Sequence, residues 1–367
     1  MNELTMPSFG ADMESGVVSE WRIKPGDRIQ KGDIIAVIET NKGAIDMETF
    51  QTGTVHELLV EPGSRVPVGT PIATLSDDKA EAPSTDSVIS TRPKASPLAR
   101  KQAQVRGIDL RGLSGSGPDG AILAADLPTP IPHRPEVNTP VPGDEKEMMR
   151  RAIAAAMVRS KREIPHYYLA TTIDLQTALE WMTQYNHDKP ADEQLLMTAL
   201  LHKAIALALL DSPELNGFYQ HGQFQSADEI HLGMAISIRT WGLITPALHR
   251  VDRAPLPELM QRMRDLTLRA RRGGLRSSEM TDATITVSSM GERGVETLFG
   301  VIYPPQVALI GIGCPQTRPW VVNGAVCPRL LVNVSLAADH RVSDGHQGAQ
   351  FLRRVTKLLQ HPERLLD

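Results

Sequence analysis

The chain has 367 residues, of which 41% are hydrophobic and 22% charged, and its formal net charge is −4. This length allows two or more domains, and the charge balance gives no basic footprint for nucleic acid. No apolar run is long enough to cross a membrane, and the first ten residues lack the features of a secretory signal. The only cysteines, Cys314 and Cys327, indicate a reducing compartment rather than a disulfide framework. We therefore expect a cytoplasmic, multidomain protein.

Two copies of one pattern fill the N-terminal part of the chain. Residues 16–38 read GVVSEWRIKPGDRIQKGDIIAVI, and residues 53–75 read GTVHELLVEPGSRVPVGTPIATL. One constant shift superimposes the glycines and the Pro-Gly turns of the two copies, which predicts two structurally equivalent halves. Each copy alternates apolar and polar residues around its Pro-Gly turn, as half-buried strands do. Lys42 lies midway between the copies, so we expect it at the tip of an exposed hairpin.

This repeat, with Glu39-Thr40-Asn41-Lys42 at its centre, resembles the lipoyl domain of 2-oxo acid dehydrogenase complexes, an all-β flattened barrel or sandwich. The resemblance covers residues 1–77 and implies that Lys42 carries lipoate in amide linkage. A related fold carries biotin on a lysine typically flanked by methionine, whereas Asn41 and Gly43 flank Lys42. Lipoate is therefore favoured over biotin. The family commonly has aspartate at the position of Asn41, and whether this affects lipoylation stays open.

Two segments read as linkers between domains. Residues 78–94 are poor in large apolar residues and contain two prolines, which indicates a flexible connection. Residues 128–145 are rich in proline, and such a density favours an extended, semi-rigid chain. These segments separate domains, and they are also suited to set the reach of a mobile arm.

Residues 95–127 predict a small unit that begins with a helix capped by serine and proline and ended by Gly107. The stretch SPLARKQAQVRGIDLRGLSGSGPDGAILAADL is similar to the small helical peripheral subunit-binding domain of the same complexes. The resemblance implies docking of the 2-oxo acid decarboxylase or the dihydrolipoamide dehydrogenase. The basic residues that would make this contact are Arg100, Lys101 and Arg106. Ala121 stands where the family usually has arginine, so the preference between the two partners stays open.

Residues 146–367 have a mixed α/β pattern. Apolar periodicity predicts helices over residues 147–162, 194–210, 255–272 and 345–360. Strands are predicted over residues 166–174, 283–290, 306–313 and 329–339, and Asn323-Gly324 predicts a type I′ hairpin turn. The apolar run LLVNVSLAA in the last strand indicates a sheet that is buried on both faces.

The end of that last strand carries the motif Asp339-His340-Arg341-Val342-Ser343-Asp344-Gly345. Spacing alone allows His340 and Asp344 to be structural residues, or two ligands of a metal site, but no suitably spaced third ligand is evident. In context the motif matches the catalytic signature of the acyltransferase domain of 2-oxo acid dehydrogenase complexes, whose α/β fold resembles chloramphenicol acetyltransferase. The likeness extends over residues 146–367 through IPHYYLATTID, SPELNG, GLITPAL, TVSSMG and IYPPQVALIGIG.

The resemblance implies acyl transfer from dihydrolipoamide on Lys42 to coenzyme A, with no metal. His340 matches the general base, and a neutral imidazole suits deprotonation of a thiol near neutral pH. Ser288 matches the hydroxyl that stabilises the tetrahedral oxyanion. Asp344 is expected to order the loop around His340. The succinyl-transferring branch tends to have threonine at the position of Ser288, so acetyl is the first expectation, followed by branched-chain acyl groups.

In the family, these domains form homotrimers with active sites between subunits, so His340 and Ser288 would come from different chains. The trimers assemble into cubic or icosahedral cores of 24 or 60 subunits. One alternative is a branched-chain 2-oxo acid dehydrogenase acyltransferase. Another is a non-catalytic scaffold that carries lipoate and docks partners, although the intact motif around His340 disfavours it. A biotin carrier fused to an unrelated acyltransferase is a third.

Overall fold

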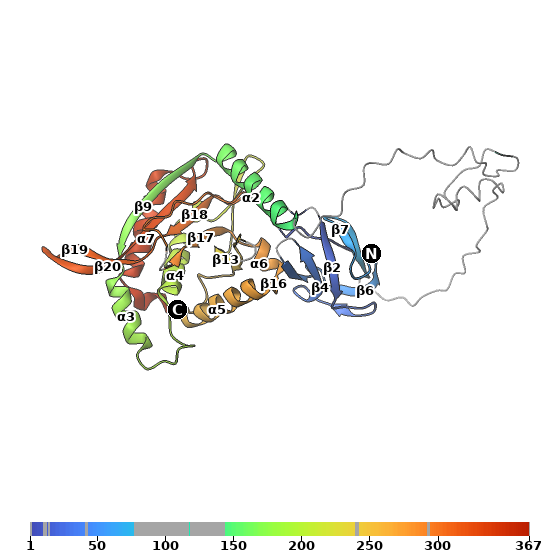
Figure 1. Ribbon diagram of the computed structural model, residues 1–367, viewed down its shortest axis with the longest axis horizontal. Helices are drawn as coiled ribbons and strands as arrows, with labels where there is room; N and C mark the ends of the chain where they lie inside the picture. Colours follow the sequence, from blue (N-terminus) through green and yellow to red (C-terminus); the bar gives the residue numbers. More distant parts are fainter. Residues whose placement is uncertain are drawn as a thin grey trace. The chain divides into compact units, whose positions relative to one another are not determined.

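The computed structural model describes residues 2–9, 13, 15–40, 43–76, 117, 144–238, 242–291 and 294–366 (Figure 1). Apart from Gly117, the predicted linker over residues 78–94 and the predicted subunit-binding domain lie outside these residues, as do Lys42 and residues 128–143 of the second predicted linker. The last two residues of that linker, Asp144 and Glu145, are described and belong to a helix that begins at Asp144, so the predicted linker extends two residues too far. No helix in the described part of the chain is both long and apolar enough to span a membrane.

The N-terminal domain is all-β, as predicted. One sheet has the order β1-β8-β6-β3, formed by Asn2–Thr5, Pro71–Ser76, Gly53–Leu58 and Arg28–Ile29. The other has the order β16-β5-β4-β2-β7, in which β5, β4, β2 and β7 are Gly43–Glu48, Ile34–Thr40, Ser15–Trp21 and Arg65–Pro67. Strand β16 (Leu275–Arg276) comes from the C-terminal part of the chain. Side chains that alternate along these strands form a separate apolar core that includes Val18, Ile38, Val55 and Leu75.

The two sequence copies adopt equivalent structures. The amide of Gly26 in the first copy donates to the carbonyl of Val55 in the second. The amide of Gly63 in the second copy donates to the carbonyl of Val18 in the first, so the two hydrogen bonds are equivalent. Gly26 and Gly63 have φ of 93° and 89°, a left-handed conformation that glycine adopts without steric cost. The repeat therefore predicted the internal quasi-two-fold symmetry of this domain correctly.

The C-terminal domain is built on a seven-stranded sheet (Figure 1). The path β15-β12-β17-β18-β20-β19 is formed by Ala247–Leu248, Leu232–Met234, Ile285–Ser289, Ala308–Ile312, Ala325–Asp339 and Gln316–Val322. Strand β9 (His166–Asp174) pairs antiparallel with β20. Asn323 and Gly324 have φ of 52° and 83°, as the predicted type I′ turn between β19 and β20 requires. Two short hairpins complete the strands, β10–β11 (Gly217–Gln220 and Gln223–Ser226) and β13–β14 (Ile236–Ile238 and Gly242–Ile244).

Helices pack around this sheet. They are α2 (Asp144–Glu163), α3 (Gln176–Asn186), α4 (Met197–Leu209), α5 (Leu256–Arg272), α6 (Ser277–Thr281) and α7 (Gly345–Leu359), with short 3₁₀ turns at Pro213–Leu215 and Pro362–Leu365. One continuous apolar core includes residues of α4, α5, α7 and the central strands, and β20 is almost fully buried from Leu331 onwards. The prediction of a sheet covered on both faces is therefore confirmed.

The predicted helix over residues 194–210 begins too early. Leu196 is extended, with φ of −112° and ψ of 151°, and the helix starts at Met197. The side chain of Asn186 accepts a hydrogen bond from the amide of Leu195 and donates one to its carbonyl, which holds the preceding segment out of the helix. Helix α3 and the hairpins β10–β11 and β13–β14 were not predicted.

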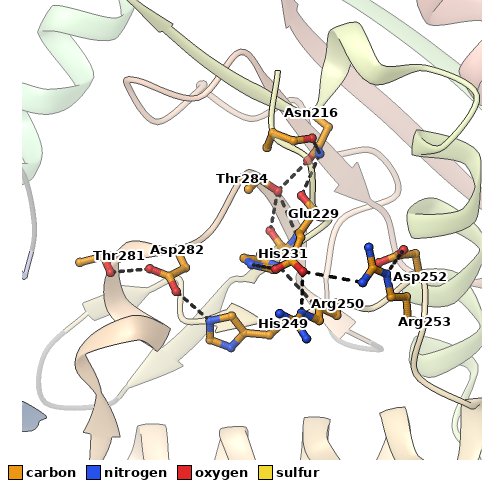
Figure 2. A network of polar contacts seen from close by, with 11 residues as sticks. Asn216, Glu229, His231, His249, Arg250, Asp252, Arg253, Thr281, Asp282 and Thr284 are labelled. Carbon is orange, nitrogen blue, oxygen red and sulfur yellow. Dashed lines mark hydrogen bonds and ion pairs between the residues drawn. The ribbon is translucent and has the colours of Figure 1, made fainter. Parts of the chain in front are cut away.

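A polar network joins the turn that follows α4 to the edge of the sheet (Figure 2). The hydroxyl of Thr284 donates to the side chain of Asn216 and to the carbonyl of His231. Nδ1 of His231 accepts from the amide of Arg250, and Nε2 lies 3.4 Å from Glu229. The ring of His249 meets that of His231 edge-on at 4.8 Å. This arrangement suits a neutral His231.

We expect this network to weaken in mild acid. Burial lowers the pKa of His231 below its ordinary value of 6.5, and His249 lowers it further. The unfolded chain therefore binds more protons than the folded chain below about pH 6.5, so stability falls as the pH drops through this range. His231→Asn keeps an acceptor for the amide of Arg250. It should reduce the slope of the free energy of unfolding against pH by up to ~1.4 kcal/mol per pH unit. Urea unfolding at pH 7.5 and 5.5 measures this.

The control is His221→Asn, because His221 is exposed and has a positive φ that asparagine tolerates. It should leave the pH dependence unchanged. An equally steep loss of stability in His231→Asn and in the unmodified protein would assign the acid sensitivity to other groups.

Candidate active site

His340 lies immediately after β20, at the edge where this strand pairs with the start of β9. Its amide donates to the carbonyl of Pro165, and its side chain is exposed. The ring of Tyr167, on β9, meets the imidazole at a centroid distance of 5.2 Å and an interplanar angle of 66°. The imidazole is therefore open to a substrate on one side and in contact with an aromatic edge on another.

The neighbouring pair Asp339 and Arg341 fixes the backbone around His340. Asp339 is fully buried, and its carboxylate accepts from Nε and Nη2 of Arg341 at 2.9 and 2.6 Å. The same carboxylate accepts from the amide of Arg341 at 3.0 Å, and the guanidinium stacks over the ring of Tyr219 at 3.9 Å. Hydrogen bonding to Asp339 raises the pKa of Arg341. Arg341 is therefore paired with its neighbour Asp339 inside the chain.

Asp344 begins helix α7. Its carboxylate accepts from the amides of His346 and Gln347, and the Gln347 side chain accepts from the amide of Asp344, which completes a capping box. The backbone hydrogen bond from Gln347 is the main reason that the pKa of Asp344 is lowered. This carboxylate caps the start of α7, and its expected role in ordering the loop around His340 stays a prediction.

Ser288 lies near the end of β17 and is half-buried. No hydrogen-bond partner for its hydroxyl is found among the described residues, so the group is available to donate. A cavity of about 620 Å³ opens beside this strand end, lined by Ser289, Met290 and Gly291 together with apolar residues of β12, β13 and α5. Its volume falls within the range of cavities that bind small molecules and cofactors.

Within one chain, Ser288 and His340 lie far apart. Ser288 pairs with Gly311 of β18, and Gly311 pairs with Ser335 of β20. His340 follows Ser335 by five residues, which corresponds to roughly 16 Å along the strand, and two strand spacings add about 10 Å across the sheet. A single chain therefore does not bring the hydroxyl and the imidazole onto one reacting group.

The cysteines take no part in this arrangement. Neither forms a disulfide; Cys314 is buried and Cys327 is half-buried on the β19–β20 hairpin.

Strands β4 and β5 flank the predicted lipoyl-lysine. Their ladder ends with Thr40 opposite Gly43, and Lys42 lies outside the described residues. The predicted role of Lys42 therefore stays a prediction.

One buried α/β sheet therefore carries an exposed histidine at the end of one strand and a half-buried serine near the end of another. The family model of the 2-oxoacid dehydrogenases acyltransferase (catalytic domain) matches residues 144–367. The model described as biotin-requiring enzyme, which covers biotin and lipoyl carriers, matches residues 2–75, and the e3 binding domain model matches residues 93–127. The chain belongs to the 2-oxoacid dehydrogenase acyltransferase family.

Relatives match over nearly the whole chain. The dihydrolipoyllysine-residue acetyltransferase component of the pyruvate dehydrogenase complex of Zymomonas mobilis is 30% identical, over 98% of both chains. The dihydrolipoamide acetyltransferase of Azotobacter vinelandii, solved in a study of a serine, a histidine and an asparagine in its catalytic mechanism, is 27% identical with a TM-score of 0.56. That alignment covers 60% of this chain and 91% of the other. The cubic core of a pyruvate dehydrogenase multienzyme complex is 28% identical, with the same TM-score and coverage.

Proposed function

We propose that this chain is a dihydrolipoyllysine-residue acetyltransferase, which passes an acetyl group from dihydrolipoamide on Lys42 to coenzyme A. The spacing of three residues carries the proposal. In the Azotobacter vinelandii enzyme, the studied histidine follows the serine by 52 positions and precedes the asparagine by four. Ser288, His340 and Asp344 have the same separations. Aspartate replaces asparagine here, and both residues serve well at a helix N-cap.

The chemistry follows from the exposed imidazole of His340 and the half-buried hydroxyl of Ser288. His340 accepts the proton of the coenzyme A thiol, and the resulting thiolate attacks the carbonyl carbon of the acyl thioester. The hydroxyl of Ser288 donates a hydrogen bond to the oxyanion of the tetrahedral intermediate. The bond from the carbonyl carbon to the lipoyl sulfur then breaks, and His340 returns the proton to that sulfur. One thioester bond is exchanged for another, and no electron is gained or lost.

The separation of Ser288 from His340 supports a site between two copies of the chain. Within the sheet of one chain, the strand register and ordinary strand spacings place the two groups roughly 19 Å apart. A thioester is only a few ångströms across, so one chain supplies the imidazole and its neighbour the hydroxyl. We propose a homotrimer that assembles into a larger core, as in the related cubic core.

The lipoyl attachment is supported by the structure on either side of Lys42. The β4–β5 ladder runs to the Thr40–Gly43 pair, and the quasi-symmetric domain around it is the carrier fold expected for a modified lysine. Lipoate in amide linkage to Lys42 supplies the thiol that carries the acyl group. Residues 93–127 match the e3 binding domain, so we propose that they dock dihydrolipoamide dehydrogenase or the decarboxylase. Two cysteines that form no disulfide favour the reducing environment of the cytoplasm.

The acyl group is tested by offering acetyl-, isobutyryl- and succinyl-coenzyme A to the purified chain with free dihydrolipoamide as acceptor. The proposal expects the highest kcat/KM with the acetyl donor. Faster transfer from the isobutyryl donor would identify a branched-chain enzyme instead. If the protein still assembled but transferred no acyl group from any donor, it would be a non-catalytic scaffold. Blots for lipoyl and biotin groups, with Lys42→Arg as control, distinguish the two carriers.

A further inference from the structure

Tyr167 is the side chain in aromatic contact with the imidazole of His340. The two rings meet edge to face at 5.2 Å, a geometry that aromatic pairs prefer. Tyr167 is half-buried and belongs to β9, whereas His340 follows β20, so the contact joins two segments far apart in the sequence. The sequence motif around His340 gives no indication of it.

Strand pairing brings Tyr167 to this position. Tyr167 lies directly opposite Ala338 on the antiparallel ladder of β9 and β20. Residues two positions along the partner strand lie on the same face, within reach of an aromatic side chain, and His340 stands two positions after Ala338. The methyl group of Ala338 leaves space for the tyrosine ring to lean towards the imidazole.

The phenol is held at its far end as well. Its oxygen lies 2.9 Å from Oγ of Ser343, which is buried, so the same loop that carries His340 also fixes Tyr167. A side chain on Gly348 of α7 would place its Cβ 3.0 Å from the phenol oxygen, so glycine at this position preserves the space that Tyr167 occupies. Burial raises the pKa of Tyr167, which keeps the phenol protonated and able to hydrogen-bond.

We propose that Tyr167, tethered by Ser343, is a positioning residue that holds the imidazole of His340 in its productive orientation. This rests on the proposed function of His340 as the general base. The ring limits rotation of the imidazole, and the tether to Ser343 limits movement of the ring. A misplacement of about 1 Å in a catalytic group reduces rates by up to about 100-fold, so a support of this kind affects turnover directly.

Three variants of the full-length assembly test the proposal. Tyr167→Leu removes the ring and should lower kcat about 10- to 100-fold, with KM for coenzyme A and dihydrolipoamide within about twofold. Tyr167→Phe keeps the ring but loses the tether and should lower kcat only about three- to tenfold. Ser343→Ala should match Tyr167→Phe, and the double variant should be no slower than either single one, because both remove the same hydrogen bond.

A second readout does not depend on activity. Carbethoxylation of His340 by diethylpyrocarbonate, followed by peptide mass spectrometry, should be faster in Tyr167→Leu, whereas modification of the exposed His346 should not change. The matched control is Tyr168→Phe, because Tyr168 is the next residue of β9, points to the opposite face and contacts Lys161 and Phe299. It should have unchanged kcat.

Unchanged kcat and unchanged His340 modification in Tyr167→Leu would overturn the proposal. A higher KM with unchanged kcat would also overturn it, because Tyr167 would then contact substrate. If His340 were modified faster in Tyr167→Leu but a His340→Ala variant had full activity, Tyr167 would still position the imidazole. His340 would then not be the general base. The two proposals therefore fail in distinguishable ways.

Discussion

Replacing His340 with alanine is expected to lower kcat for acyl transfer between acetyl-coenzyme A and dihydrolipoamide by about 100- to 10,000-fold. The imidazole is exposed at the end of β20, where we propose that it accepts the proton, and a thiol with an ordinary pKa of about 8.5 is mostly protonated at neutral pH. The thiolate must therefore be generated during the reaction. KM for both substrates should change little, because the imidazole takes part in proton transfer during the reaction and not in substrate binding. Initial rates with both substrates varied provide kcat and KM separately.

The matched control for this prediction is His346→Ala. His346 lies in the first turn of α7 and its side chain is exposed, with Gln350 as its partner. Its removal should leave kcat within about twofold of the unmodified protein. Both variants should sediment as assemblies of the original size, because the His340 side chain is exposed and supports no core packing. A His340→Ala assembly of native size with native kcat would exclude His340 as the general base.

The local features of the fold could be predicted from the sequence because each depends on a few neighbouring residues. Strand β9 has the predicted bounds, and the turn at Asn323-Gly324 follows from the backbone freedom of its two residues. The equivalence of Gly26 and Gly63 required only the repeat itself. Helix α4 was displaced at its start because Asn186, eleven residues before the helix, binds the backbone of Leu195.

The candidate site was predictable in its residues and not in its geometry. The motif from Asp339 to Gly345 indicated His340 as the candidate base, and the likeness of TVSSMG to a known family indicated Ser288; their catalytic roles stay predictions. The distance between them depends on the register of β17 against β18 and of β18 against β20, which no local pattern encodes. Tyr167 was missed for the same reason, since its pairing with Ala338 joins strands more than 150 residues apart. In the strand pattern it reads as an ordinary alternating aromatic residue.

Lys203 in α4 is expected to be among the most sensitive positions for folding. Its side chain is fully buried, and Nζ donates to the carbonyls of Asp252 and Ala254 at 2.9 and 2.8 Å. These carbonyls belong to the turn that leads into α5, so the ammonium group fixes the entry of that helix. Lys203→Met keeps most of the volume but leaves both carbonyls without this donor, which should cost about 2–4 kcal/mol. Lys203→Ala adds a cavity and should cost ~1–2 kcal/mol more.

The order of these losses separates hydrogen bonding from packing. Urea unfolding followed by circular dichroism, at one fixed protein concentration, should place the midpoints in the order unmodified protein, Lys203→Met, Lys203→Ala. Lys357→Met and Lys357→Ala are the controls, because Lys357 is exposed on α7 and its replacement should change stability by less than about 0.5 kcal/mol. If Lys203→Met were as stable as the unmodified protein, the two carbonyls would have found other donors, and the lysine would contribute through its aliphatic chain alone. If instead Lys203→Met and Lys203→Ala lost equal stability, the hydrogen bonds would account for the whole effect, and the core around α4 would close over the missing side chain.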